Sequence, residues 1–431
     1  MMLVWMFVWM FVWMLVWMLV IVEAQDAVVE YDETIGLQIN TSDPLTQPVL
    51  VNGIDVVQMT MMQQEKLEDL GHVLRAQRSL IEKQHAENRA LSAEVSLLKQ
   101  SVCKLDRPAS ATLPSSGTSL RWRGGVLGPN GLIFGIPSDA TAVLIIDPVS
   151  NTLDTTSISG LPGSLWKWCN GVLSTETGSI YGFPVFQDAV LKIDPAAKAA
   201  DMTSLVGLGE TQFEKWGSGV LGLDGLIYGI PAGATSVLII DPLTDAIDTT
   251  TLSGLPTDTN KWVGGVVVAD GRIVCVPRSA ASVLVINPVA GTLDTSSIPV
   301  GTTADKWSGA VLAPNGRVVG IPLSSGTVLL VDAVTMTADV DSIAGLEGNQ
   351  AWFGGVLVPG SNSIVTIPYN SDTALVIDLH TNTTDAVTFA GVSSGANQFI
   401  GGVMANTGVL YTMPFNAQAV LAITPGCRLG S

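Results

Sequence analysis

The chain has 431 residues, of which 47% are hydrophobic and 13% are charged, and its formal net charge is -18 at pH 7. Such an apolar, charge-poor composition excludes a largely disordered chain. The acidic balance also argues against a partner with a phosphate backbone, because nucleic-acid binding needs a basic stripe. The length allows one large domain or two to three smaller ones.

The first residues are uniformly apolar. Nothing is charged before Glu23, and residues 4–19 repeat the tetrapeptides VWMF and VWML. Val22 and Ala24 are small residues with the spacing of a cleavage site, which predicts a signal peptide over residues 1–24. The alternative is an uncleaved membrane anchor, since about 20 apolar residues can cross a bilayer. Either one places the rest of the chain outside the cytosol, and the glycosylation sequons at Asn40 and Asn382 are compatible with that.

An acidic segment with short β-like runs covers residues 25–55, and a helical pattern follows over residues 56–104. Apolar residues recur there with the 3-4 spacing of a coiled coil. The predicted seam is Leu67, Leu70, Leu74, Gln77, Ile81, Gln84, Asn88, Leu91, Val95, Leu98 and Val102. The seam favours a parallel homodimer, the two Gln leave a trimer open, and a helix packed on its own domain is a further alternative. His72 lies off the seam and is expected to be solvated.

From Arg121 onward the chain repeats itself. One equivalent position recurs with steps of 46, 48, 46, 45, 45 and 47 residues, and it holds Trp122, Trp168, Trp216, Trp262, Trp307, Trp352 and Phe399. Each copy divides into four short β-like runs, and the first two are joined by Asn-Gly or Asp-Gly, a strong hairpin signal. Four strands at this period are one blade of a β-propeller. The sequence therefore predicts an all-β, seven-bladed β-propeller over residues 108–431.

The seventh copy has no fourth strand of its own. Residues 109–122 read like the fourth strand and link of an ordinary copy. We therefore expect this N-terminal segment to complete the last blade, which would also remove an exposed strand edge.

The repeats contain runs such as VLIIDPVSNTLDTTSI and SVLIIDPLT, followed by a Gly-rich link and a strand such as IYGIP. These runs resemble YVTN-type propeller repeats. The resemblance covers residues 108–431 and lies in strand and turn positions. It implies an extracellular or surface-layer scaffold or recognition module rather than a particular activity.

Four cysteines are present. Cys103 precedes the predicted closing strand and Cys427 follows the third strand of the same blade, so neighbouring strands would bring the two within disulfide reach. The alternative is an inter-chain bond at the end of the coiled coil. Cys169 and Cys275 lie inside strands and are expected to be buried thiols. The spacing of cysteine and histidine predicts no metal site.

Residues that recur in every blade are expected to be structural. The Trp series is interpreted as inter-blade packing, with sugar-binding platforms as the alternative. The recurring aspartates are interpreted as turn caps, with ion ligation as the alternative. They are Asp147, Asp194, Asp241, Asp332 and Asp378. His380 is expected to be solvated, no cofactor motif is present, and enzyme activity has no support.

Differences between blades indicate a candidate binding face. The loop after the second strand begins with a different residue in each copy, in order Ser138, Val185, Ala232, Arg278, Leu323, Tyr369 and Phe415. Phe186, Arg278, Tyr369 and Phe415 give this face aromatic and cationic anchors, the residue types enriched at binding hot spots. Trp166, an extra aromatic residue just before Trp168, is a further candidate.

These observations favour a secreted or cell-surface oligomeric propeller that acts as a recognition or adhesion module, with carbohydrate as a ligand class. Two alternatives stay open at this stage. One is a structural component of an extracellular assembly without a small ligand. The other is a carbohydrate-active hydrolase or lyase that uses acids in the ring opening.

Overall fold

The computed structural model describes residues 22–23, 28–32, 36–40, 50–51, 54–55, 62–81, 83–84, 88, 109–114 and 121–425, apart from 211–213, 347, 389–391 and 393–394. The chain divides into two compact units, residues 1–93 and 94–431. Each unit is described here by itself.

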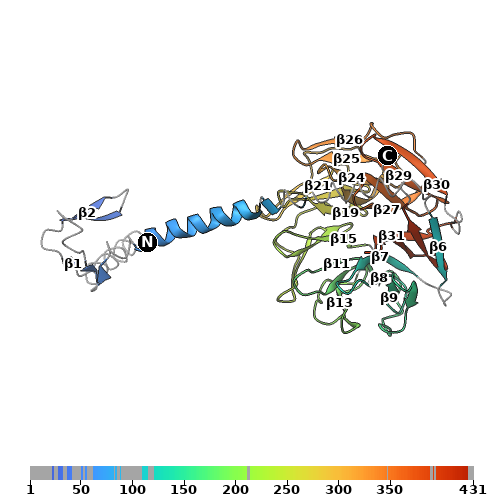
Figure 1. The fold of residues 1–431 in the computed structure, drawn as a ribbon, viewed down its shortest axis with the longest axis horizontal. Helices are drawn as coiled ribbons and strands as arrows, with labels where there is room; N and C mark the ends of the chain where they lie inside the picture. The colour runs from blue at the N-terminus through green and yellow to red at the C-terminus, as the bar shows by residue number, and fades with distance from the viewer. Residues whose placement is uncertain are drawn as a thin grey trace. The chain divides into compact units, whose positions relative to one another are not determined.

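The larger unit is the predicted seven-bladed β-propeller, built of four-stranded antiparallel sheets (Figure 1). The innermost strands are β7 (Trp122–Leu127), β11 (Trp168–Leu173), β15 (Trp216–Leu221), β19 (Trp262–Val267), β23 (Trp307–Leu312), β27 (Trp352–Leu357) and β31 (Phe399–Met404). The second strands are β8 (Ile133–Pro137), β12 (Ile180–Pro184), β16 (Ile227–Pro231), β20 (Ile273–Pro277), β24 (Val318–Pro322), β28 (Ser363–Pro368) and β32 (Leu410–Pro414).

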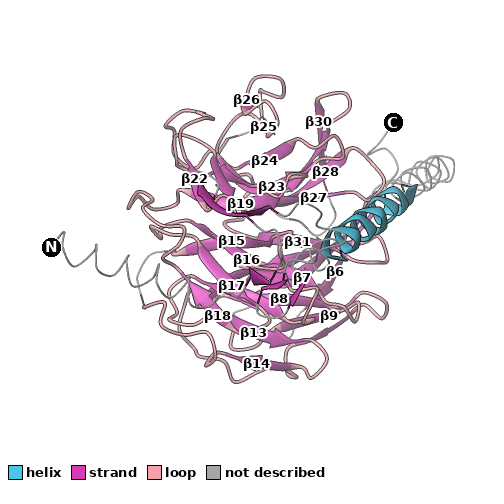
Figure 2. Cartoon of the chain, turned by 90° about the vertical axis from the view of Figure 1, so that its left-hand side faces the viewer, coloured by secondary structure: helices cyan, strands magenta, loops and turns pink. Residues whose placement is uncertain are grey.

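The outer strands are shorter than the inner ones in the first five blades. The third strands are β9 (Leu144–Asp147), β13 (Leu191–Asp194), β17 (Leu238–Asp241), β21 (Leu284–Asn287), β25 (Leu329–Asp332), β29 (Thr373–Asp378) and β33 (Ala419–Thr424). The outermost strands are β10 (Thr152–Asp154), β14 (Ala199–Asp201), β18 (Ala246–Asp248), β22 (Thr292–Asp294), β26 (Thr337–Asp339), β30 (Thr383–Thr388) and β6 (Ala109–Pro114). Strands and loops alone make up the described propeller (Figure 2).

The ring closes as the sequence predicts. Strand β6 pairs antiparallel with β33, with Leu113 opposite Val420 and Ala109 opposite Thr424. In Figure 1 the teal β6 lies beside the red strands of the last blade. The first described strand of this unit is therefore the outer edge of its last blade, and β31 contacts β7 of the first blade.

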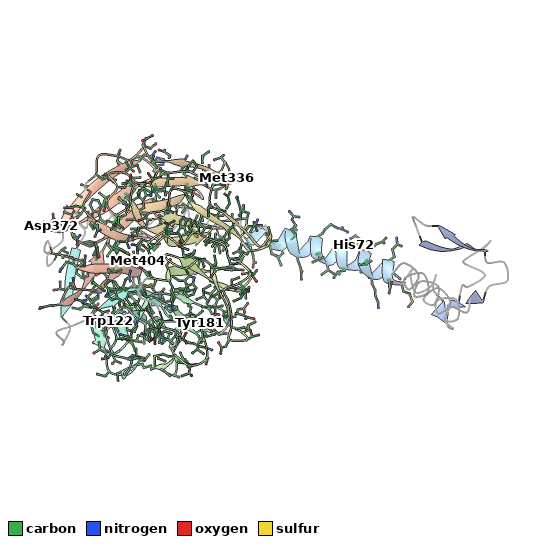
Figure 3. The ribbon with its side chains drawn as sticks, turned by 180° about the vertical axis from the view of Figure 1, so that it is seen from behind. His72, Trp122, Tyr181, Met336, Asp372 and Met404 are labelled. Carbon is green, nitrogen blue, oxygen red and sulfur yellow. The ribbon has the colours of Figure 1, made fainter. Side chains whose placement is uncertain are left out.

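The hydrophobic core lies between blades, and each interface contains one member of the Trp series. Trp352, which is 2% exposed, packs with Val319 and Ile321 of the preceding blade and with Ile364 and Ile377 of its own. Side chains fill the described propeller, where Trp122 is the first of the series (Figure 3). The six indole nitrogens donate hydrogen bonds of 2.7 to 2.9 Å to carbonyl oxygens of their own blades, at Ala142, Ala189, Ser236, Ser282, Thr327 and Thr373. The Trp series is thus inter-blade packing, as expected.

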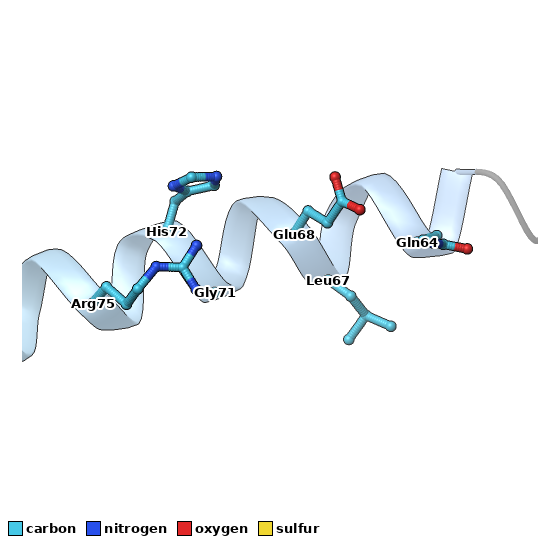
Figure 4. A pocket seen from close by; sticks show the side chains of 6 residues that line it. All are labelled: Gln64, Leu67, Glu68, Gly71, His72 and Arg75. Atoms are coloured by element: carbon cyan, nitrogen blue, oxygen red, sulfur yellow. The ribbon is translucent and has the colours of Figure 1, made fainter.

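The smaller unit contains β2 (Val28–Asp32) paired with β3 (Gly36–Asn40), and a sheet of β1 (Val22–Glu23), β4 (Leu50–Val51) and β5 (Ile54–Asp55). A helix follows over residues 62–81. Figure 4 shows Leu67 on a different side of this helix from Glu68 and His72. None of the helices in the described residues combines the length and the apolar character that a membrane crossing requires.

The coiled coil stays a prediction, because the structure contains a single chain and a coiled coil needs helices from two or more. The predicted seam residues within the described helix are solvent-exposed in the single chain, with Leu67 at 68%, Leu70 at 54% and Leu74 at 56%. The predicted signal peptide falls almost entirely outside the described residues, which include only Val22 and Glu23 of residues 1–24.

Two of the four cysteines can be placed. Cys169 and Cys275 are free and fully buried, as the sequence predicts, and burial raises the pKa of both thiols well above the usual range. Cys103 and Cys427 lie outside the described residues.

Removal of β6 is expected to destabilise the ring. A chain of residues 116–431 would lack β6, expose the edge of β33 and lose six cross-strand pairs, each of which contributes roughly 0.2–1 kcal/mol. Its Tm should be lower by about 5 °C or more than that of residues 105–431, and it should aggregate on size-exclusion chromatography through the open edge. Equal Tm values and elution volumes would show that β6 is dispensable for closure.

Candidate binding face at the mouth of the channel

The innermost strands converge around a central channel. Every innermost strand has a β-bulge just after its Trp or Phe residue. At the bulge Gly264 has a φ of 98°, and a Cβ there would lie 2.6 Å from the Cα of Gly309 in the next blade. Glycine is therefore required by both the left-handed backbone and the close approach. The channel encloses a cavity of about 190 Å³ that is lined mainly by these glycines.

A chain of backbone hydrogen bonds, here called the belt, joins the blades at the end of the channel where the second strands finish. In each blade the residue after the strand-ending Pro donates its N–H to the carbonyl of the residue before the Trp or Phe; Tyr369, for example, donates to Ala351 at 2.9 Å. The residue before the next Trp or Phe then donates back, as Gln398 does to the carbonyl of Tyr369 at 2.8 Å. These alternating bonds run from Arg121 to Phe415 and fix where the loop residues of each blade lie.

Four buried lysines support the same end of the ring. Each stands directly before a Trp of the series and is at most 4% exposed, namely Lys167, Lys215, Lys261 and Lys306. The ammonium of Lys261 donates to three loop carbonyls, those of Ala232, Ala234 and Asp258. Burial lowers the pKa of Lys167, Lys215 and Lys261 to about 8. We interpret these lysines as cross-links between the loops rather than as binding residues.

An apolar cluster, here called the plug, closes the channel inside the belt. It combines residues that follow the strand-ending Pro with residues that follow the Trp or Phe, from blades three to seven. Its buried members are Ala232, Val263, Leu323, Phe353, Ile400 and Phe415, and Trp166 and Tyr369 pack against it. Because Val263 and Phe353 also line the channel cavity, the plug is the floor of the face above it.

The structure brings the predicted aromatic residues together around the plug. Trp166 lies with its ring centroid 5.6 Å from that of Phe415 and 6.4 Å from that of Phe186. Tyr369 lies 5.3 Å from Phe353, another aromatic residue of the plug. Phe415 is only 3% exposed, so it supports the face from beneath, whereas Trp166, Phe186 and Tyr369 are partly exposed.

A buried ion pair lies beside Trp166. Arg123 is 3% exposed, and its Nη2 donates to Oε1 of Glu214 at 3.1 Å. Its guanidinium carbon lies 5.2 Å from the centroid of the Trp166 ring, a cation–π contact. Burial opposes the charge of Arg123, but Glu214 and other neighbours outweigh that effect and raise its pKa. The Nε and Nη1 groups of Arg123 are buried and have no hydrogen-bond partner within the described part of the chain.

The other two arginines at the mouth are also paired with carboxylates. Arg278 donates from Nε to Oδ1 of Asp305 at 2.5 Å, and Gln350 reaches the other oxygen of Asp305 at 3.4 Å. Arg121 pairs with Asp139 at 3.0 Å. The three arginines of the face are therefore matched by three carboxylates.

Trp166 has a strained backbone. Its φ is 55°, in the left-handed region. The same position, two residues before the Trp or Phe, has positive φ in blades four to seven, where it holds Asn260, Asp305, Gln350 and Asn397. Asn and Asp tolerate this conformation, but for a bulky residue it is a true outlier that costs roughly 1–3 kcal/mol. The carboxylate of Asp139 holds the backbone N–H of Trp166 at 2.7 Å.

The other recurring residues are structural. The carboxylates of the Asp series accept hydrogen bonds from the backbone N–H groups that follow them, as Asp332 does from Val334 and Thr335. The described residues contain no group of His, Cys, Asp and Glu that suits a metal ion. His380 is exposed, and Asn382 lies in the exposed turn between β29 and β30.

Sequence reasoning missed Arg123, Glu214 and the lysines. The lysines are visible as a Lys-Trp pair repeated in four copies. Arg123 and Glu214 stand at positions that change from blade to blade, so an alignment of the repeats at every column would have shown them as departures. Their pairing joins the first and third blades, on either side of the second, which a single copy of the repeat does not reveal.

The strain at Trp166 predicts an unusual order of stabilities. Trp166→Gly and Trp166→Ala lose the same ring, but Gly adopts positive φ freely, so Trp166→Gly should be more stable by about 1 kcal/mol in chemical unfolding. At the neighbouring Leu165, which does not have positive φ, the Ala variant should be the more stable one. The same order at both positions would contradict the strain.

Comparison with solved structures finds propellers of low sequence identity. A streptogramin B lyase matches with a TM-score of 0.57 and 11% identity over 73% of this chain and 97% of the other. A catalytically inactive virginiamycin B lyase from Staphylococcus aureus with quinupristin matches with a TM-score of 0.60 and 9% identity over 74% and 99%.

The extracellular domain of a candidate hybrid two-component system from B. thetaiotaomicron has a TM-score of 0.53 and 12% identity over 74% of this chain and 43% of the other. No family model and no curated protein sequence matches the chain. At these identities the likeness establishes the seven-bladed fold and nothing finer.

Proposed function

We propose that this protein is a secreted or cell-surface recognition module that binds carbohydrate on the face above the plug. The observation that carries the proposal is the convergence of Trp166, Phe186 and Tyr369 around one axial floor. Partly exposed aromatic rings with a few polar groups beside them are the composition of a ligand site. Recurrent residues elsewhere are engaged in packing and turn capping, so the face is where the repeats differ.

The extracellular part of the proposal rests on the sequence. A signal peptide over residues 1–24, the sequons at Asn40 and Asn382 and a Cys103–Cys427 disulfide all belong to an oxidising, extracellular setting. The YVTN-type resemblance and the propeller in an extracellular domain agree with it. The signal peptide, the glycosylation at both sequons and the disulfide are part of the proposal.

We further propose that the helix joins copies of the chain into a homodimer, with a trimer as the alternative. Most of the stability of a helix in a protein comes from packing of its apolar face, and Leu67, Leu70 and Leu74 are left exposed in the single chain. A second copy would cover them. Linking several faces would increase the overall binding strength through avidity.

A hydrolase or lyase is the second candidate, favoured by the fold likeness to two lyases. Glu214 is an acid at the mouth, but it is paired with Arg123. A structural component without a small ligand is the third.

A glycan array with the full-length protein separates these functions. Binding is expected, and Tyr369→Ala should weaken it by about tenfold, since truncation of a hot-spot residue costs more than about 1 kcal/mol. His380→Ala, an exposed change in the turn between β29 and β30, should leave binding unchanged. Release of cleaved glycan would favour the enzyme instead, and an array without binding would favour the structural component.

Oligomerisation is expected to depend on one face of the helix. Leu70→Asp and Leu74→Asp each place a charge in the predicted seam and should convert the oligomer to monomer in light-scattering mass measurements. Leu80 is also exposed, at 60%, but lies off the seam, so Leu80→Asp should leave the mass unchanged. A monomeric native protein, or equal effects at all three positions, would contradict the coiled coil.

A further inference from the structure

We propose that Trp166, with Glu214 and Arg123 beside it, forms a subsite for an uncharged sugar ring. This inference rests on the proposed recognition function and narrows it to one place on the face and one class of ligand. Three observations carry it: the strained backbone of Trp166, a set of unpaired polar atoms around its ring, and the balance of charge at the mouth.

The first observation concerns Trp166 itself. Its position requires a left-handed backbone, and two of the other blades fill it with Asn. A Trp there costs stability that Asn would not, and strain of this kind concentrates at binding sites. The indole N–H points to the same role. The six Trp residues of the repeat donate theirs to carbonyls of their own blades, whereas within the described part of the chain the N–H of Trp166 has no acceptor.

The second observation is the mixture of unpaired donors and acceptors beside the ring. Arg123 lies over the indole and has two buried groups, Nε and Nη1, without a partner among the described residues. Glu214 binds Arg123 through Oε1, and its Oε2 accepts no hydrogen bond from any described residue. Buried polar groups are nearly always satisfied, so the two unpartnered groups of Arg123 are exceptions. A ligand with hydroxyl groups can accept from the indole N–H of Trp166 and donate to Oε2 of Glu214.

The third observation is that the arginines of the site are balanced by carboxylates. Arg121, Arg123 and Arg278 each pair with a carboxylate. An acidic ligand would meet no unpaired arginine, since the four lysines at this end are buried, and it would approach a protein of net charge -18. A cationic ligand would be repelled by Arg123, whose guanidinium already makes the cation–π contact with the Trp166 ring. A flat apolar ring with hydroxyl groups fits what remains, since hydroxyls donate and accept.

The test uses the full-length protein on an array of neutral hexose and N-acetylhexosamine glycans together with sialylated, sulfated and uronate-containing glycans. We expect binding to the neutral set. The best neutral glycan is then titrated by calorimetry into the wild type and three variants. Trp166→Ala should weaken binding at least about tenfold, and Trp166→Phe, which keeps a ring but loses the N–H, should weaken it by a smaller factor. His380→Ala, an exposed change in the turn between β29 and β30, should have no effect.

The possible failures are distinguishable. Binding only to acidic glycans, reduced by Tyr369→Ala, would leave the recognition function intact and overturn the uncharged ligand. Neutral binding that Trp166→Ala and Trp166→Phe leave unchanged would overturn the subsite alone. If Trp166→Ala does not fold, as judged by its thermal unfolding transition, Trp166→Phe carries the test. An array with no binding would overturn the subsite together with carbohydrate recognition.

Discussion

The belt of backbone hydrogen bonds is the constraint on which the face depends. Each bond joins a residue that follows a strand-ending Pro to a residue that precedes a Trp or Phe, alternately within a blade and between blades. Because backbone groups make these bonds, the belt requires no particular side chain at the positions that follow the strand-ending Pro residues. Those positions hold Ser, Val, Ala, Arg, Leu, Tyr and Phe in turn without loss of the architecture. The main chain thus maintains the fold, while the side chains at these seven positions can vary.

Beneath the belt, the narrow channel limits the size of the side chains on the innermost strands. Neighbouring bulges approach so closely that a Cβ on Gly309 would lie 2.9 Å from the Cα of Gly354. Two blades depart from glycine and are tied to their neighbours instead. Asn170 donates to the carbonyl of Gly217 at 2.6 Å, and Ser218 accepts from the N–H of Gly264 at 3.1 Å. Because the channel has no room for larger side chains, variation is confined to its mouth, where the blades diverge and the plug forms.

The repeat period, the hairpin turns and the closing strand could be predicted from the sequence, because each is a local pattern or a missing copy of one. Strand β6 was identified because the last repeat lacks a fourth strand, and the placement of Phe186, Tyr369 and Phe415 on one face followed from their places in the repeats. Trp166 was a separate candidate, and its contact with Phe186 and Phe415 was not predicted. The burial of Phe415 beneath Trp166 did not follow, since depth depends on which side chains from other blades fill the axis. The Arg123–Glu214 pair was missed for the same reason: 91 residues separate the two in the sequence.

The blades differ at the position two residues before the Trp or Phe, and this difference is why we propose one ligand site rather than seven equivalent ones. At the position two residues before the Trp or Phe, blades four, five and seven hold residues suited to a left-handed backbone, and blade six holds Gln350, which reaches Asp305. Blade two alone holds a large aromatic ring there among the described copies, and the blades on either side of it supply Arg123 and Glu214. A stability requirement would favour Asn in all of these blades. The fold itself does not require the three departures around one ring, and the proposed ligand would account for them.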